Sequence, residues 1–175
     1  MILLSGCATL SQEDCRRGDW FGLGVRDGLA GENRGRLSDH VKACYEYGIA
    51  INNVAYFAGR EQGLRDYCRI DNAFSVGLNG QRYQHVCPPS IDGLFGRYHS
   101  AAFALYEHRA EVDRLDREIY NKESRLHDKK LSDKDRERIR FELRDMDRRY
   151  HYLRDDLYYH ERQLDDLRRE AQVYR

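Results

Sequence analysis

The chain has 175 residues, and its 30 basic and 30 acidic side chains leave no net charge. A mean hydropathy of −0.86 and the lack of a long apolar run exclude a protein that crosses the membrane on apolar helices. Nucleic-acid binding generally needs a surplus of basic charge, so no nucleic-acid partner is expected.

The composition changes abruptly along the chain. All five cysteines, both prolines and 12 of the 14 glycines lie within residues 1–90, whereas two thirds of the charged residues follow. Pro88 and Pro89 mark the change, because two consecutive prolines cannot continue a helix. We predict an all-α protein with three parts: a remnant of a lipoprotein signal peptide at 1–7, a Cys/Gly-rich helical domain at 8–90, and a helical hairpin at 91–175.

The first residues end in Leu4-Ser5-Gly6-Cys7, followed by Ala8. This pattern resembles a bacterial lipobox, in which cleavage before the cysteine accompanies attachment of diacylglycerol to its thiol. We therefore expect a lipid anchor on Cys7 to be the membrane partner of the chain. The resemblance to lipoprotein sorting signals favours the outer membrane, with the protein facing the periplasm, because Ala8 is not aspartate. The alternative is an ordinary buried cysteine.

Four cysteines remain after Cys7, namely Cys15, Cys44, Cys68 and Cys87. An oxidising envelope and a small domain both favour disulfides. Three pairings are possible, and sequence alone does not choose among them. We favour Cys15–Cys44 with Cys68–Cys87, since each would close a local loop. A metal site is less favoured, because no C-x-x-C pair occurs. We expect no metal and no other cofactor.

Three segments share an aromatic residue followed three positions later by glycine. They are Phe21-x-x-Gly24, Tyr56-x-x-Gly59 and Phe74-x-x-Gly77, with further glycines at Gly28, Gly63 and Gly80. Glycines four residues apart lie on one helix face and allow a second backbone to approach closely. We interpret the repeats as packing faces of short helices. The alternative is a surface of Trp20, Tyr56 and Tyr83 that binds a glycan or another small ligand.

Several ordered motifs run through the same half of the chain. They are Cys15-x-x-x-Asp19-Trp20, Gly24-x-x-Asp27-Gly28, Cys44-x-x-x-Gly48, Tyr56-x-x-Gly59-x-x-x-Gly63-Leu64-x-x-Tyr67-Cys68 and Gly77-x-x-Gly80-x-x-Tyr83-x-x-x-Cys87-Pro88. Together they resemble the proteobacterial lipoprotein family catalogued as domain of unknown function 2799, over roughly residues 4–90. The resemblance implies a secreted, cysteine-stapled, lipid-anchored domain, and it implies no activity.

The second half repeats apolar residues at helical spacing on both sides of a short break. In the break, Ser132 is followed three residues later by Asp135, which predicts a helix start. If the chain folds back there, the residue numbers of every facing pair add to the same total: Leu126 with Ile139, Ile119 with Met146, Leu115 with Tyr150, Val112 with Leu153, and Ala101 with Leu164. One antiparallel register therefore satisfies the whole seam, which predicts a coiled-coil hairpin.

The hairpin also offers a candidate protein-binding surface. Tyr152, Tyr158 and Tyr159 lie among arginines, and Tyr and Arg are enriched in interface hot spots. An envelope protein or a second copy of the chain is the partner we expect. His108 and His160 fall on the seam, where we expect hydrogen-bonded histidines rather than metal ligands.

No motif for a hydrolase, a metalloprotease or a phosphate loop is found in the sequence, so we expect no enzyme. The sequence instead favours a lipid-anchored envelope protein with a structural or adaptor role, whose hairpin contacts a protein. The alternative function is an envelope module that binds a glycan or small ligand through the first domain.

Overall fold

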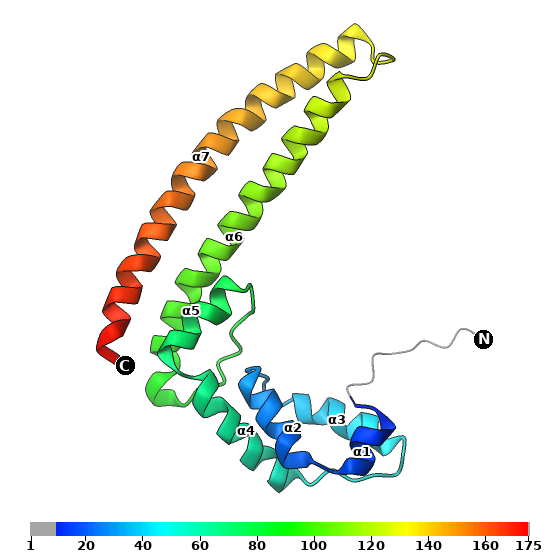
Figure 1. The fold of residues 1–175 in the computed structure, drawn as a ribbon, viewed down its shortest axis with the longest axis vertical. Helices are drawn as coiled ribbons and strands as arrows, with labels where there is room; N and C mark the ends of the chain where they lie inside the picture. Colours follow the sequence, from blue (N-terminus) through cyan, green and yellow to red (C-terminus); the bar gives the residue numbers. More distant parts are fainter. Residues whose placement is uncertain (1–9, 175) are drawn as a thin grey trace, which may run out of the picture. The chain divides into compact units, whose positions relative to one another are not determined.

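In the computed structural model, residues 10–174 are described, so the predicted lipid anchor at Cys7 lies outside the described residues. Helices make up 79% of the described residues, and no strand occurs between residues 10 and 174, which confirms the all-α fold class. The elements, in chain order (Figure 1), are α1 (Gln12–Arg17), α2 (Trp20–Leu29), α3 (Arg36–Tyr45), α4 (Asn53–Tyr67), α5 (Ile70–Leu78), α6 (Pro89–Leu126), α7 (Asp133–Ala171) and the 3₁₀ turn η1 (Gln172–Tyr174).

Contacts divide the chain into two compact units. The first comprises the described residues up to Asn72 together with Tyr83–Gly96, and the second comprises Ala73–Arg82 with the described residues from Arg97 onward. Residues 73–82 precede the change of composition at Pro88 but belong to the second unit. Helices α5 and α6 therefore each contribute residues to both units.

Polar side chains start most of the helices. Ser11 and Asp14 form a capping box at α1. The Asp19 side chain accepts a hydrogen bond from the Gly22 backbone N–H at α2, and the Asn52 side chain accepts one from the Ala55 backbone N–H at α4. At α7 the Ser132 hydroxyl accepts a hydrogen bond from the Asp135 backbone N–H over 3.1 Å, which confirms the predicted helix start. Each such cap satisfies a backbone donor that the helix itself leaves unpaired.

Two disulfides cross-link the first unit. Cys15 of α1 is bonded to Cys44 of α3, and Cys68 at the end of α4 is bonded to Cys87, with Cα atoms 5.6 Å apart in both. This is the pairing that the loop lengths favour. Cys15 and Cys44 also belong to the apolar core of this unit, so the first cross-link lies inside packed side chains.

Helices α2 and α4 of the first unit cross through their glycines. A Cβ atom on Gly24 would meet the carbonyl oxygen of Tyr56, and a Cβ atom on Gly59 would meet the carbonyl oxygen of Phe21. The same clash with the facing backbone arises at Gly28 and Gly63. The backbones can approach this closely only because these positions lack side chains, as the repeated spacing predicts.

In the second unit, the third glycine repeat packs α5 against α6. A Cβ atom on Gly77 would lie 2.6 Å from the carbonyl oxygen of His99 and 2.7 Å from the Cβ atom of Ala102. Next to this contact the rings of Phe74 and Tyr98 stack with their centroids 5.0 Å apart. The repeat therefore places its glycine against α6 rather than against α2 or α4.

Helices α6 and α7 run side by side in opposite directions along the second unit (Figure 1). Val112 and Leu115 of α6 pack with Leu153 of α7, and three further predicted seam residues, Ile119, Met146 and Tyr150, pack against them together with Leu157. Ion pairs cross from α6 to α7 beside these contacts: Arg97–Glu170 at 2.7 Å, Arg109–Glu161 at 2.8 Å, Arg149–Glu111 and Lys122–Glu142.

Among the described residues, no helix combines the length and the apolar composition that a membrane span requires.

Candidate functional site

The three aromatic residues of the proposed ligand surface do not form one surface. Tyr56 is fully buried and Trp20 is half-buried against the same core cluster. Tyr83 is half-buried elsewhere in the first unit, where its ring contacts those of Tyr67 and Phe95. Tyr56 therefore cannot present its ring to a ligand, and the sequence pattern of aromatic residues was misleading because it does not distinguish core from surface.

The hydroxyl of Tyr56 belongs to a buried polar network. Its hydroxyl donates a hydrogen bond to Oδ2 of Asp27 over 2.6 Å, and Nε2 of His40 lies 2.8 Å from the same oxygen. Tyr56 is 0% exposed, His40 is 2% exposed and Asp27 is 9% exposed. The network joins α2, α3 and α4, and its members lie 13 and 29 residues from Asp27 along the chain.

The contacts in this network shift the pKa values of Asp27 and Tyr56. Burial acts to raise the pKa of Asp27, but the hydrogen bonds from His40 and Tyr56 outweigh it, and the pKa is lowered from its ordinary value. Burial and the carboxylate of Asp27 raise the pKa of Tyr56. The trio combines an acid, a histidine and a hydroxyl, but its atoms are enclosed by the core, so we assign it a structural role.

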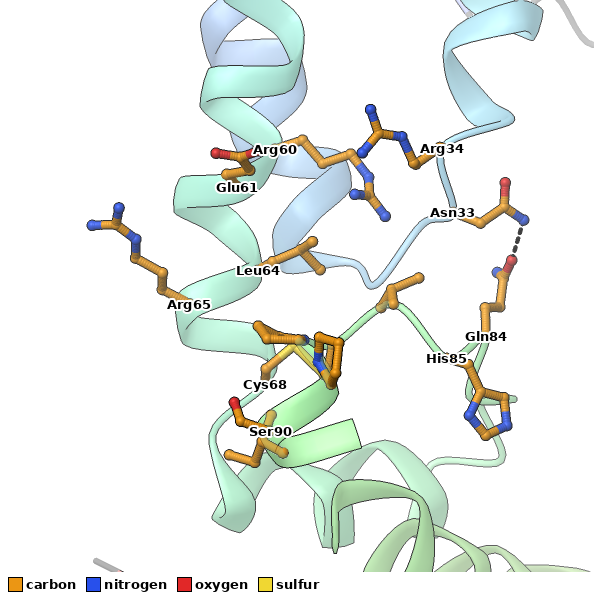
Figure 2. A pocket seen from close by; sticks show the side chains of 15 residues that line it. Asn33, Arg34, Arg60, Glu61, Leu64, Arg65, Cys68, Gln84, His85 and Ser90 are labelled. Carbon is orange, nitrogen blue, oxygen red and sulfur yellow. Dashed lines mark hydrogen bonds between the residues drawn. A yellow bond between two sulfur atoms is a disulfide. The ribbon is translucent and has the colours of Figure 1, made fainter. Parts of the chain in front are cut away.

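The first unit also contains an open groove with a volume of about 870 Å³ (Figure 2). The segment 33–34, helix α4 and the segment 84–91 form its walls, and the Cys68–Cys87 disulfide lies among them. None of Trp20, Tyr56 and Tyr83 lines it. The side-chain amides of Asn33 and Gln84 are hydrogen-bonded to each other across one edge, so two segments far apart in sequence meet here.

Positive charge gathers on one side of the groove. Figure 2 shows the guanidinium groups of Arg34 and Arg60 turned toward the same space, whereas Glu61 and Arg65, which also line the groove, extend to the other side of α4. Arg60 is only 5% exposed, and it donates hydrogen bonds from Nε and Nη2 to the backbone carbonyl of Glu32. Burial lowers the pKa of Arg60, and the positive charge of Arg34 acts in the same direction.

A second hydrogen-bond cluster shapes the other wall. The Tyr83 hydroxyl donates to Oδ1 of Asp92 over 2.6 Å and accepts from the backbone N–H of Cys87 over 3.2 Å. Nδ1 of His85 lies 3.1 Å from Oδ2 of the same Asp92. Burial raises the pKa of Tyr83, and the hydrogen bond to Asp92 raises it further. Tyr83, which the sequence suggested as a ligand-binding residue, thus holds the segment that carries Cys87 through hydrogen bonds.

The tyrosines predicted to face a partner are exposed on α7. Tyr152 is 70% exposed, Tyr158 is 61% exposed and Tyr159 is 63% exposed. The guanidinium carbon of Arg162 lies 5.8 Å from the centre of the Tyr158 ring. Phe141, which was not predicted from the sequence, is also exposed on α7, at 65%.

His108 and His160 lie together between α6 and α7, with ring centroids 4.2 Å apart. The expectation that both are hydrogen-bonded is wrong for His108, because its Nδ1 atom is buried and has no hydrogen-bond partner. A carboxylate that was not predicted from the sequence joins the two histidines: Asp156 precedes His160 by four residues and contacts both rings within ion-pair distance.

These features define a disulfide-bonded, all-helical domain whose chain continues into two long helices. Residues 19–104 match a family model described as "Protein of unknown function (DUF2799)". The resemblance drawn from the cysteine, glycine and aromatic motifs is thereby confirmed over this segment. No curated protein and no solved structure matches the chain.

Proposed function

We propose that the chain is a non-enzymatic structural or adaptor protein of the cell envelope, attached to the outer membrane through a lipid on Cys7 and facing the periplasm. Two observations support this compartment. The sequence around Cys7 resembles a lipobox, and the four remaining cysteines are paired in disulfides, which persist in oxidising compartments. In this proposal, α6 and α7 form an antiparallel coiled-coil hairpin that contacts a protein partner.

The observation that carries the adaptor role is a row of exposed aromatic residues on α7. Phe141, Tyr152 and Tyr159 are 65%, 70% and 63% exposed. They follow one another at intervals of 11 and 7 residues, which returns each to nearly the same face of an α-helix. Single exposed aromatics are common, but a row on one face is typical of an interface.

The aromatic row is not needed to hold α6 and α7 together. The contact between these helices is made by other positions, such as Val112, Leu115 and Leu153. Charged side chains of both signs surround the row, for example Arg148 paired with Asp145 at 2.9 Å. A partner protein with a complementary apolar strip and a polar rim fits this surface best.

Photocrosslinking in the producing cell tests this role. A photoreactive amino acid is placed at Tyr152, and in a matched control at Asp147, which is also exposed on α7 but faces away from the row. We expect a crosslinked product from position 152 and none from position 147. Mass spectrometry of the product distinguishes a second copy from another protein. No product at position 152, or equal products at both positions, would contradict the adaptor role.

The groove in the first unit favours a second candidate function, the binding of a small ligand. The lining differs from the aromatic surface expected from the sequence, since Arg34 and Arg60 provide positive charge there. Among the described residues, neither has an acidic partner within ion-pair distance. We therefore infer that the ligand carries a carboxylate or phosphate group, which the Arg34 guanidinium can bind through two parallel hydrogen bonds, since Arg60 already donates from Nε and Nη2 to the Glu32 carbonyl.

A titration of the full chain with inorganic phosphate tests this candidate, with backbone NMR shifts as the readout. We expect shifts confined to the groove, and an affinity roughly tenfold weaker in Arg34→Ala, a loss of about one charge-assisted contact. Arg16→Ala is the matched control, because Arg16 of α1 is exposed and does not line the groove. Equal weakening in both variants would indicate general charge attraction and would contradict a specific site.

A further inference from the structure

We propose that His108, Asp156 and His160 form a binding site for a divalent transition-metal ion, with Zn²⁺ as the representative ion, and that the bound ion joins α6 to α7. One ligand atom from each of the three side chains lies within 4.8 Å of the others. This inference is independent of the envelope location and of the adaptor role. It rests on the geometry of the three side chains and on the chemistry of their donor atoms.

The positions follow from helix geometry. Asp156 and His160 are four residues apart on α7, so their side chains lie one above the other on the same face. His108 approaches them from α6. The Asp156 Oδ2 atom lies 3.5 Å from Nδ1 of His108 and 3.9 Å from Nε2 of His160.

These separations are close to those of ligands that share one ion. Zinc binds nitrogen and carboxylate oxygen at roughly 2.0–2.2 Å, so two of its ligands in a tetrahedral arrangement lie about 3.5 Å apart. Small rotations of the His160 and Asp156 side chains would therefore bring all three atoms onto one ion. Three protein ligands leave one position for water.

The unsatisfied Nδ1 atom of His108 and the charge of Asp156 also favour a bound cation. Nδ1 of His108 is buried and has no hydrogen-bond partner. Buried polar atoms are nearly always satisfied, so an unsatisfied one calls for an explanation. Among the described residues, Asp156 is paired with no lysine or arginine, and the nearby Arg109 is already paired with Glu161. A metal ion would satisfy both the imidazole nitrogen and the carboxylate.

The surroundings favour an ion that remains accessible. The side chains of His108, Asp156 and His160 are 26%, 35% and 21% exposed, so solvent reaches the cluster at its edge while the Nδ1 atom of His108 lies inside it. Leu105 and Leu153, at neighbouring levels of the seam, are 2% and 7% exposed. Two imidazoles and one carboxylate suit Zn²⁺, Co²⁺ or Ni²⁺ better than Mg²⁺ or Ca²⁺, which prefer oxygen ligands.

The experiment is a titration of the full, tag-free chain with Zn²⁺ and with Co²⁺, with both disulfides intact and the Cys7 thiol alkylated. We expect one equivalent of Zn²⁺ by calorimetry and a visible absorption band from bound Co²⁺. His108→Ala and Asp156→Asn should each weaken Zn²⁺ affinity by roughly tenfold or more. Retention of one equivalent at unchanged affinity in both variants would overturn the proposal.

The chain offers a matched control on the same helix. Asp147 and His151 repeat the spacing of Asp156 and His160, with atoms 3.6 Å apart, but both are exposed. We expect His151→Ala to leave Zn²⁺ binding unchanged. Because a variant can disturb α7, imidazole NMR of the unaltered chain gives a second readout: Zn²⁺ should shift the His108 and His160 signals and leave His151 in place. Shifts of His151 alone, or of no histidine, would also overturn the proposal.

Discussion

Gly28 of α2 and Gly63 of α4 face each other so closely that a Cβ atom on either residue would lie 2.9 Å from the Cα atom of the other. This contact is made by backbone atoms, which cannot rotate away as a side chain can. The crossing of α2 and α4 therefore depends on the absence of side chains at these two positions. The same crossing positions Arg60 at the groove and Tyr56 in the buried network.

The glycine contact predicts a large effect from a single methyl group. Gly28→Ala should lower the free energy of unfolding by about 3 kcal/mol, the upper part of the range for overpacked sites. Gly93→Ala is the matched control, since a Cβ atom there meets no atom within 4 Å. Within a helix that change should stabilise the chain by roughly 0.5–1 kcal/mol. Urea unfolding measures both values, and equal effects of the two substitutions would contradict the close crossing.

The two disulfides predict similar contributions to stability. The cross-linked cysteines are 29 and 19 residues apart, and loops of this size correspond to roughly 3–4 kcal/mol each. The double substitution Cys15→Ala with Cys44→Ala, and the corresponding pair at Cys68 and Cys87, should each lower the denaturant midpoint. Peptide mapping without reduction tests the pairing itself, and a Cys44–Cys68 peptide would contradict it.

The buried carboxylate predicts a dependence of stability on acid pH. The pKa of folded Asp27 is lowered below its ordinary value of 3.8. Its ionised form therefore stabilises the fold above about pH 4, and this contribution is lost as the pH falls through the folded pKa. Asp27→Asn should lack this contribution, so the difference in unfolding free energy between the two proteins should shrink below pH 4.

An exposed carboxylate serves as the control for that experiment. Asp66 is exposed on α4, so Asp66→Asn should change the unfolding free energy by less than about 0.5 kcal/mol. The measurement is urea unfolding between pH 7 and pH 2.5 for the three proteins. A difference between unaltered chain and Asp27→Asn that does not vary with pH would show that the carboxylate of Asp27 is not stabilised by its contacts.

The packing between α6 and α7 predicts that substitutions at neighbouring positions of α7 have different effects on the free energy of unfolding. Leu153 is 7% exposed and packs with Val112 and Leu115, whereas Tyr152 is 70% exposed. Leu153→Ala should lower the free energy of unfolding by roughly 2–5 kcal/mol. Tyr152→Ala should change it by about 0.5 kcal/mol or less. Comparable losses from both substitutions would contradict the register of the two helices.

Features set by local spacing could be predicted from the sequence. The helix start at Ser132, the seam positions of α6 and α7 and the glycine faces of α2 and α4 each depend on residues a few positions apart. Of the three possible disulfide pairings, loop length favoured one without excluding the others, and it is the pairing found.

The groove and the buried network could not be predicted in this way. Asn33 and Gln84 are 51 residues apart, and their contact depends on the whole first unit. Tyr56 was expected on a surface, but an aromatic residue beside a glycine suits a core equally well. The Asp156–His160 spacing was visible in the sequence, yet only the structure shows that His108 lies opposite it.

The proposal that the chain is a lipid-anchored, disulfide-bonded envelope protein is tested most directly by its intact mass, measured without reduction after extraction from the envelope of the producing cell. We predict a chain that begins at Cys7, carries acyl groups on that residue and has the two disulfides described between Cys15 and Cys44 and between Cys68 and Cys87. An unmodified chain with free thiols would contradict the anchor, the disulfides and the compartment together.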